Sequence, residues 1–285
     1  MGIEDSGSFD IGGDLRVHRL GFGAMRLCGP GIWGHPPDRD NAARVLHRAL
    51  ELGVNFIDTA DAYGPEVNEE QLAAALSPYA DGLVIATKGG LARGGPGIWE
   101  TDGRPEHLVR AVQNSLRRLE LECIDLYQLH APDDDVPFAD SVGALARARE
   151  AGHIRHVGLS NVSLEQLEEA RSIVPIATVQ NRYNLTYRGR EEVLERCTEL
   201  GIGFIPWYPL ASAELSRAGA GALRDVSDAH GATPSQVALA WLLGRSPVML
   251  PIPGTSKVAH LEENLAAAGL RLTAAERSRL DALES

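Results

Sequence analysis

Four residues whose side chains could carry acid–base chemistry stand at or just after the ends of expected strands. They are Asp58 and Tyr63 in VNFIDTADAYG, Lys88 in LVIATKGG and His130 in IDLYQLHAP. A tyrosine donates a proton near neutral pH only if its neighbours lower its pKa from about 10. A lysine beside the phenol favours the phenolate, and an aspartate paired with that lysine keeps the ammonium charged. These residue types therefore predict a proton donor directed at a carbonyl group.

A carbonyl that accepts a hydride develops negative charge on its oxygen, which must be protonated or stabilised. Tyr63 can supply the proton, and His130 can donate a hydrogen bond to the same oxygen. In a second assignment, which stays open, His130 is the acid and Tyr63 is a bystander. Taken singly, each residue has a commoner structural role, such as a cap, a solvated charge or a core histidine. Their joint position on one rim of the expected fold favours chemistry.

Short β-rich segments alternate with longer amphipathic segments along the whole chain. Helices are expected where capping residues flank an apolar period, at 38–52, 105–120, 139–151 and 233–244. Strands are expected at 18–25, 54–60, 83–89, 125–130, 156–160, 177–181, 203–207 and 248–253. About eight such alternations predict a single (β/α)8 TIM-barrel domain over residues 1–285. The competing open doubly wound sheet would require a Gly-rich fingerprint, and GFGAMRL lacks its third glycine.

Two features lie outside this alternation. The segment FDIGGDLRV predicts a short N-terminal β-hairpin that turns at Gly12–Gly13 and plugs the bottom of the barrel. The Gly/Pro-rich stretches 28–37 and 89–104 follow the first and third strands. Loops on that side of a barrel build the active site.

Composition limits the classes of function. The net charge of −12 over 285 residues argues against a nucleic-acid binder. No run of about 18 apolar residues appears, so no membrane span is expected, and the N-terminus lacks signal-peptide regions. The three cysteines without CxxC spacing indicate reduced thiols and a cytoplasmic location. The nine histidines show no metal-binding spacing, so no metal is expected. The oligomeric state stays unknown.

A series of segments resembles the aldo-keto reductase family, in order, from about residue 15 to the end. The segments are ELGVNFIDTADAYG (51–64), IDLYQLHAP (124–132), HIRHVGLSN (153–161), VQNRYN (179–184), GFIPWYPLA (203–211) and LPIPGTSKVAHLEEN (250–264). The resemblance implies a TIM barrel that binds NADP(H) without a Rossmann fold. It also implies a catalytic tetrad of Asp58, Tyr63, Lys88 and His130.

The cofactor-binding residues follow from the same resemblance. Ser160, Asn161 and Gln180 match positions that bind the nicotinamide carboxamide, and Trp207 matches the aromatic residue that stacks on the ring. Segment 253–264 resembles the loop and helix start that hold the adenosine phosphate. The remaining expected cofactor residues are Gly23, Ala24, Met25, Asp58, Tyr208, Pro209, Leu210, Ile252, Gly254, Thr255, Ser256, Lys257, His260, Glu263 and Asn264.

Two positions depart from the family pattern on the phosphate side. His260 stands where an arginine is frequent, and Gly254 stands where a lysine is common. Lys257 and His260 are the nearby substitutes, with hydroxyls from Thr255 and Ser256. NADP(H) is the expected cofactor, and NAD(H) use is possible.

The substrate side of the pocket is expected to involve Met25, Trp33, Trp99 and Ala131. Ala131 stands where many relatives carry a tryptophan, which opens that wall. The chain is also similar to a bacterial branch of the family that includes pyridoxal reductases, so pyridoxal is a candidate among small-molecule carbonyl substrates. Two alternatives remain open: a regulatory subunit that senses the cofactor, and a Schiff-base aldolase that uses Lys88 as its nucleophile.

Overall fold

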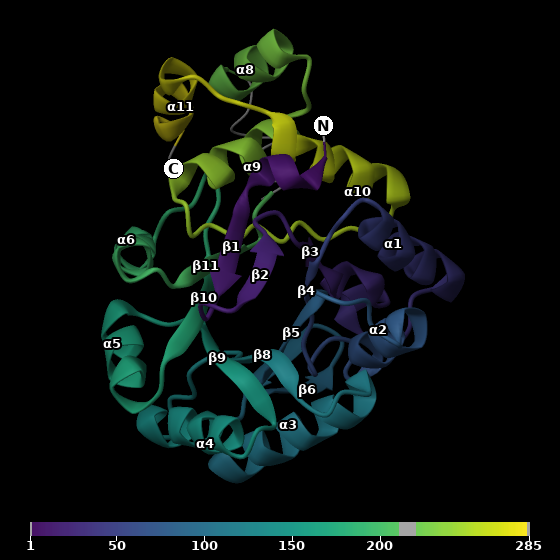
Figure 1. The fold of residues 1–285 in the computed structure, drawn as a ribbon, viewed down its shortest axis with the longest axis vertical. Coiled ribbons are helices and arrows are strands. Elements are labelled where there is room, and N and C mark those ends of the chain that lie inside the picture. The colour runs from purple at the N-terminus through teal and green to yellow at the C-terminus, as the bar shows by residue number, and fades with distance from the viewer. Residues whose placement is uncertain (1, 211–220, 284–285) are drawn as a thin grey trace.

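The structure, a computed structural model, describes residues 2–210 and 221–283. Its central element is a parallel sheet that curls around an axis (Figure 1). In Figure 1 its strands lie at the centre and the helices lie outside them. The seven strands pair in the order β11-β10-β9-β8-β5-β4-β3. Their bounds are β3 (Phe22–Gly23), β4 (Phe56–Asp58), β5 (Val84–Gly89), β8 (Ile124–Leu129), β9 (Ile154–Ser160), β10 (Ile176–Arg182) and β11 (Gly203–Trp207). The expected (β/α) barrel is confirmed, although Ala211 of the 203–211 segment lies outside the described residues.

The expected strand at 248–253 is wrong, but the segment still closes the ring. Phe204 of β11 accepts a hydrogen bond from the backbone of Leu250, at 2.8 Å. On the other side, Gly21 donates to the carbonyl of Pro251, at 2.9 Å. Proline has no backbone N–H, so the prolines at 251 and 253 interrupt the regular ladder that a strand requires.

The helices cover the outside of the sheet, and the capping residues explain where two of them begin. Asp38 accepts a hydrogen bond from the backbone of Asn41 at 2.8 Å, and Thr233 accepts one from Gln236 at 3.3 Å. The α-helices are α1 (Arg39–Glu51), α2 (Val67–Leu76), α3 (Pro105–Leu119), α4 (Phe138–Glu150), α5 (Leu164–Ile173), α6 (Glu191–Leu200), α8 (Ala222–His230), α9 (Pro234–Arg245), α10 (Val258–Leu265) and α11 (Ala274–Asp281). Short 3-10 helices are η1 (Ile3–Ser6), η2 (Ala24–Leu27), η3 (Pro30–Ile32) and η4 (Ala266–Gly269). None of the described helices is long and apolar enough to cross a membrane.

The predicted N-terminal hairpin is present as β1 (Ser8–Ile11) and β2 (Leu15–His18). Gly12 and Gly13 form its turn with φ of 65° and 89°, values that favour glycine. The inward side chains of the hairpin form one apolar cluster with side chains from inside the barrel. Its members are Ile11, Leu15, Val17, Phe56, Val84, Ala86, Leu126, Ala177, Ile205, Leu250 and Ile252. The hairpin therefore seals one end of the barrel with buried apolar surface.

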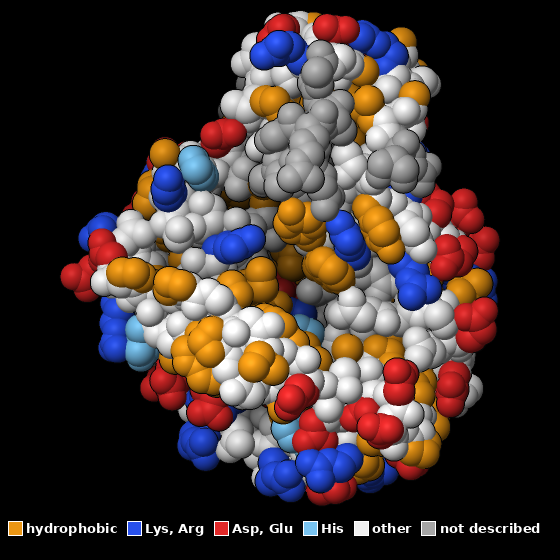
Figure 2. Space-filling view, turned by 180° about the vertical axis from the view of Figure 1, so that it is seen from behind, with side chains coloured by type: hydrophobic (Ala, Val, Ile, Leu, Met, Phe, Trp, Pro, Cys, Tyr) orange, Lys and Arg blue, Asp and Glu red, His pale blue; other side chains and the backbone are white. Residues whose placement is uncertain are grey.

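The opposite end of the barrel carries the long connections. The stretch 89–104 contains an antiparallel pair, β6 (Leu91–Gly95) and β7 (Ile98–Thr101), which the sequence did not predict. Backbone contacts tie it to the stretch 28–37, since Gly97 donates to the carbonyl of Gly31 at 3.3 Å. Figure 2, which views the molecule from the side opposite to Figure 1, shows a hollow near the centre with hydrophobic side chains around it.

Candidate active site

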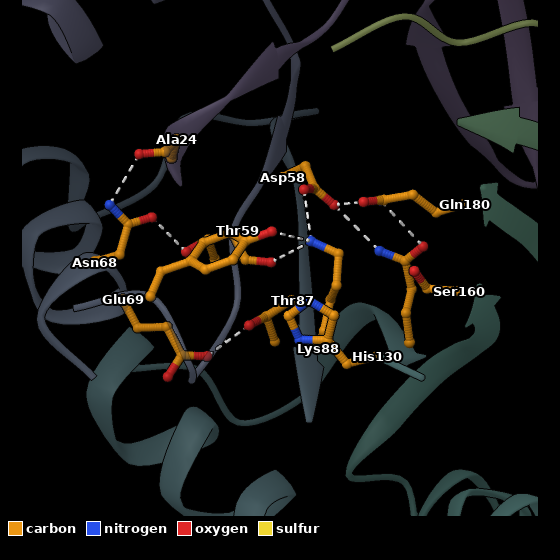
Figure 3. Close-up of polar contacts among 12 residues, drawn as sticks. Ala24, Asp58, Thr59, Asn68, Glu69, Thr87, Lys88, His130, Ser160 and Gln180 are labelled. Atoms are coloured by element: carbon orange, nitrogen blue, oxygen red, sulfur yellow. Dashed lines mark hydrogen bonds and ion pairs between the residues drawn. The ribbon is translucent and has the colours of Figure 1, made fainter. Parts of the chain in front are cut away.

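A buried ion pair lies at the base of the hollow, between β4 and β5. Lys88 Nζ donates to Asp58 Oδ1 at 2.6 Å and to the carbonyl oxygen of Thr59 at 2.8 Å. The same ammonium lies 3.3 Å from the Tyr63 hydroxyl oxygen. The parallel register pairs Asp58, at the end of β4, with Ala86 of β5, two residues before Lys88, so Asp58 and Lys88 lie on the same side of neighbouring strands (Figure 3). Both charged side chains are buried.

The charge state of Lys88 follows from these contacts. Burial disfavours the ammonium, but Asp58 and Tyr63 together raise the pKa of Lys88 above its ordinary value. The ammonium is thus charged at neutral pH and acts as a fixed positive centre beside the phenol. A fixed charge in a site closed to water interacts more strongly than the same charge in solvent.

The pKa of Tyr63 departs from the expectation drawn from the sequence. Burial raises the pKa of the Tyr63 hydroxyl, and the nearby Lys88 ammonium offsets only part of that rise. The expected net lowering is therefore wrong for the free protein, because the phenol is more deeply buried than the sequence reveals. Tyr63 remains protonated at neutral pH, which is the form that a proton donor requires, and the Lys88 ammonium holds the pKa of Tyr63 below that of an equally buried phenol without the charge. A net pKa below 10 is therefore not the condition that this site meets; it provides instead a fixed positive charge that favours the phenolate as the proton leaves.

His130 lies edge-on to Tyr63, with their ring centroids 5.7 Å apart. Burial lowers the pKa of His130 well below its usual range, and the charges of Lys88 and Arg93 lower it further. The imidazole is therefore neutral at physiological pH. A neutral ring can donate one hydrogen bond but is not a ready proton source, which weighs against the assignment of His130 as the acid.

Two buried amides fix the second oxygen of the Asp58 carboxylate. Gln128 Nε2 donates to Asp58 Oδ2 at 3.1 Å, and Gln180 Nε2 donates to the same oxygen at 2.9 Å (Figure 3). Gln128 is a site residue that sequence reasoning missed. The signal was its position two residues before His130, which directly follows β8, because alternate residues of an extended chain point to the same side.

A further layer of hydrogen bonds holds the ends of the two strands against α2. Thr59 Oγ1 donates to Asn68 at 2.6 Å, and Asn68 in turn donates to the carbonyl of Ala24 at 3.0 Å. Thr87 Oγ1 donates to Glu69 at 2.6 Å (Figure 3). Because these residues adjoin Asp58 and Lys88 in sequence, the layer restrains the backbone that carries the ion pair.

The hollow is a cavity of about 530 Å³ that unites most of the expected site residues. Its lining includes three of the four residues expected to form the tetrad, whereas Lys88 is not part of the lining. Its lining consists of Gly23, Met25, Arg26, Asp58, Tyr63, Trp99, His130, Ser160, Asn161, Gln180, Trp207, Tyr208, Pro209, Leu210, Ile252, Pro253 and Gly254. Trp33 and Ala131, expected in the substrate pocket, are not among these residues. Trp33 instead forms a backbone bridge with Gly64.

The polar side chains expected at the carboxamide form one connected group. Asn161 Nδ2 donates to Ser160 Oγ at 3.0 Å and to the carbonyl of His130 at 2.9 Å. Trp207 Nε1 donates to Asn161 Oδ1 at 2.9 Å, which fixes the indole at the cavity rim. The arrangement offers amide groups beside a flat aromatic surface, which suits a planar ring that bears an amide.

The residues expected on the adenosine side lie beyond the cavity lining. Thr255, Ser256, Lys257, His260, Glu263 and Asn264 make up this group, and Ala24, expected elsewhere in the cofactor site, also lies outside the lining. Glu263 accepts a hydrogen bond from Thr233 Oγ1 at 2.7 Å, and Asn264 is buried. The structure therefore brings together the expected nicotinamide side more completely than the adenosine side.

Arg26 is a cavity residue that the sequence did not single out. It is exposed, and it stands close to Gly254: a Cβ built on Gly254 would lie 3.6 Å from Arg26 Cγ. A Cβ on Gly254 would also meet the Gly23 carbonyl oxygen at 2.6 Å. The two glycines thus allow β3 and the 252–254 segment to approach closely, and Arg26 adds a positively charged side chain to the cavity lining.

Comparisons with known proteins agree with this geometry. A model of the aldo/keto reductase family matches residues 19–285. The chain is 52% identical to an uncharacterized oxidoreductase of Schizosaccharomyces pombe, over 94% of this chain and 87% of that protein. It is 44% identical to pyridoxine 4-dehydrogenase of Escherichia coli, over 98% of each chain. An aldo-keto reductase of Klebsiella pneumoniae in complex with NADPH superposes with a TM-score of 0.82 at 27% identity, covering 97% of this chain and 94% of that one.

Proposed function

The chain belongs to the aldo/keto reductase family, and on that premise we propose that it is an NADP(H)-dependent oxidoreductase that reduces an aldehyde or ketone to an alcohol, with Tyr63 as general acid. The observation that carries the proposal is the buried Lys88 ammonium, paired with Asp58 and 3.3 Å from the Tyr63 hydroxyl at the base of the cavity.

The residues of the cavity fit a nicotinamide cofactor. The Ser160–Asn161 group and Gln180 offer polar atoms for an amide, and Trp207 offers a flat face. The E. coli and Klebsiella relatives, named as a dehydrogenase and as an NADPH complex, support the same reading. When bound, the cofactor supplies the hydride, and the protein supplies position and the proton.

The four residues of the proposed tetrad then have separate roles in the reaction. Tyr63 donates its proton to the carbonyl oxygen, and the Lys88 ammonium stabilises the phenolate that the transfer leaves. Asp58, held by Gln128 and Gln180, keeps that ammonium oriented. Neutral His130 donates a hydrogen bond that orients the carbonyl oxygen before transfer.

The aldolase alternative is less well supported. A lysine that forms a Schiff base must be neutral, which requires a lowered pKa. Here Asp58 and Tyr63 raise the pKa of Lys88, and the amine is fully buried. Borohydride trapping of substrate on Lys88 would nevertheless establish that chemistry directly.

Pyridoxal is our candidate substrate because of the E. coli relative, which is named for the oxidation of pyridoxine. The pocket wall agrees with a flat ring, since Met25 and Trp99 line the cavity beside Tyr63. A panel of aldehydes that includes pyridoxal, benzaldehyde and propanal tests this candidate. Turnover of each aldehyde is followed by loss of the nicotinamide absorbance.

Replacement of Gln180 by Ala should weaken NADPH binding about fivefold or more, because one amide hydrogen bond to the carboxamide is lost. Fluorescence titration with NADPH measures the change, and Gln113→Ala, at an exposed position of α3, is the matched control. An unaltered affinity would remove Gln180 from the cofactor site.

Replacement of Arg26 by Ala should weaken the binding of NADPH and NADH to the same extent, by about tenfold. Arg26 lines the cavity and its Cγ lies close to Gly254, so we assign its guanidinium to the diphosphate, which both cofactors share. Arg117→Ala, at an exposed position outside the cavity, is the control. A loss confined to NADPH would instead place Arg26 at the 2′-phosphate.

The experiment that tests the proposed function is titration of the purified protein with NADPH and NADH, followed by the aldehyde panel. We expect tighter binding of NADPH and turnover of at least one aldehyde. Binding without turnover of any aldehyde would favour the regulatory subunit. The absence of binding would contradict the cofactor assignment.

A further inference from the structure

Arg93 of β6 ties together three loops at the rim of the cavity. Its guanidinium makes five hydrogen bonds, all to backbone carbonyl oxygens, of Gly31, Ile32, Ala62, Gly95 and Ile98. These carbonyls belong to the stretch after β3, the loop that carries Tyr63 and the β6–β7 hairpin. An arginine has five N–H donors, so those of Arg93 are all engaged. The side chain is therefore not available to grip an anionic substrate.

The face of the same guanidinium lies against an indole of the cavity wall. Arg93 Cζ is 3.6 Å from the centroid of the Trp99 ring and 5.6 Å from that of Trp33. The Trp99 ring in turn stands edge-on to Tyr63, with centroids 6.3 Å apart, and to His130, with centroids 6.5 Å apart. Trp99 thus contacts the proposed proton donor on one side and a fixed cation on the other.

Trp99 needs such a restraint because it stands on an exposed strand. All four residues of β7 are exposed, and Trp99 is 39% exposed. Without a partner, the indole would occupy several rotamers in the free protein, and a substrate that packs against it would have to restrict them at a cost in conformational entropy. Stacking on a planar guanidinium that is itself held by five carbonyls removes most of that freedom in advance.

We propose that Arg93 is a specificity-determining residue that holds Trp99 as a rigid aromatic wall beside Tyr63, so that the enzyme prefers flat aromatic carbonyl substrates over small aliphatic ones. This inference rests on the proposed function. A planar aromatic substrate buries a large contact area against a fixed indole at a small cost in conformational entropy. A short alkyl chain makes little contact with the same indole.

The test is the ratio of kcat/KM for benzaldehyde to kcat/KM for propanal, with NADPH as cofactor. Arg93→Met should lower this ratio about tenfold, because the stacking cation and its carbonyl contacts are lost. Arg93→Lys keeps the charge but loses the planar fork, so it should also lower the ratio. The ratio is the chosen readout because Arg93 also lowers the pKa of His130, an effect that both substrates share.

A double-mutant cycle separates this role from general loosening of the loops. If Arg93 acts through Trp99, the variant R93M/W99A should have the same ratio as W99A alone. An unchanged ratio in both Arg93 variants, or additive effects in the cycle, would overturn the proposal. A wild-type protein that turns over pyridoxal but neither benzaldehyde nor propanal would overturn the preference proposed here, whereas a protein that turns over no aldehyde of the panel would contradict the proposed function itself. NADPH titration of each variant verifies that the cofactor site has folded.

Discussion

Replacement of Tyr63 by Phe should lower kcat for carbonyl reduction by about 10²-fold or more, while NADPH binds with nearly unchanged affinity. The change removes one hydroxyl and preserves the ring that packs edge-on against His130 and Trp99. The loss therefore reports proton donation rather than collapse of the pocket. Steady-state kinetics with pyridoxal or benzaldehyde, combined with fluorescence titration, measure the two effects separately.

A matched control removes a tyrosine hydroxyl elsewhere. Tyr79 donates to the carbonyl of Leu119 at 2.8 Å and does not line the cavity. Tyr79→Phe should lose some stability, since one hydrogen bond disappears, but should keep its turnover. Near-normal turnover by Tyr63→Phe would end the assignment of Tyr63 as the acid and would return attention to His130.

Replacement of Lys88 by Met should be the second severe change, with reduction slowed by about 10²-fold or more. The ammonium lowers the pKa of Tyr63, whereas burial and the Asp58 charge raise it. Without Lys88, the pKa of Tyr63 rises further, so the phenol stays protonated but becomes a weaker acid. The rate of reduction falls at every pH, and its alkaline limb moves to higher pH. Alcohol oxidation needs the phenolate, so the rising limb of its pH–rate profile also moves to higher pH.

The pH–rate profiles of wild type and variant, measured in both directions, check this sign. Lys88→Met also leaves Asp58 as an uncompensated buried charge, which costs about 3–5 kcal/mol of stability. The double variant D58N/K88M removes both charges and should recover stability without recovering activity. A profile that does not move in either direction would contradict the role of Lys88.

Much of the site was predictable from the sequence because it depends on regular elements. Asp58, Lys88 and His130 stand at the ends of parallel strands, and a parallel sheet brings such ends to one rim. The pair Gly12–Gly13 predicted the hairpin for a similar reason, because glycine readily adopts the positive φ that a tight hairpin turn requires. Both glycines have positive φ in the structure. In each case a local rule determined the position.

The parts that were missed depend on tertiary contacts. The segment 248–253 looks like a strand in composition, but its prolines cannot donate to a ladder. The direction of the Tyr63 pKa shift depends on the depth of burial, which no local pattern gives. Gln128 and Arg26 gain their roles from neighbours that are distant in sequence, Asp58 and Gly254 respectively.

The most direct test of the central claim is hydride transfer itself. NADPH with deuterium in place of both hydrogens at the nicotinamide C4 position would be incubated with the protein and pyridoxal, and the product alcohol would be examined by mass spectrometry. We expect the wild-type protein to place deuterium at the former carbonyl carbon of the product. The Tyr63→Phe variant should form the same deuterated product, but more slowly. A product without deuterium, or no product from any carbonyl of the panel despite tight NADPH binding, would contradict the assignment of this protein as a carbonyl reductase.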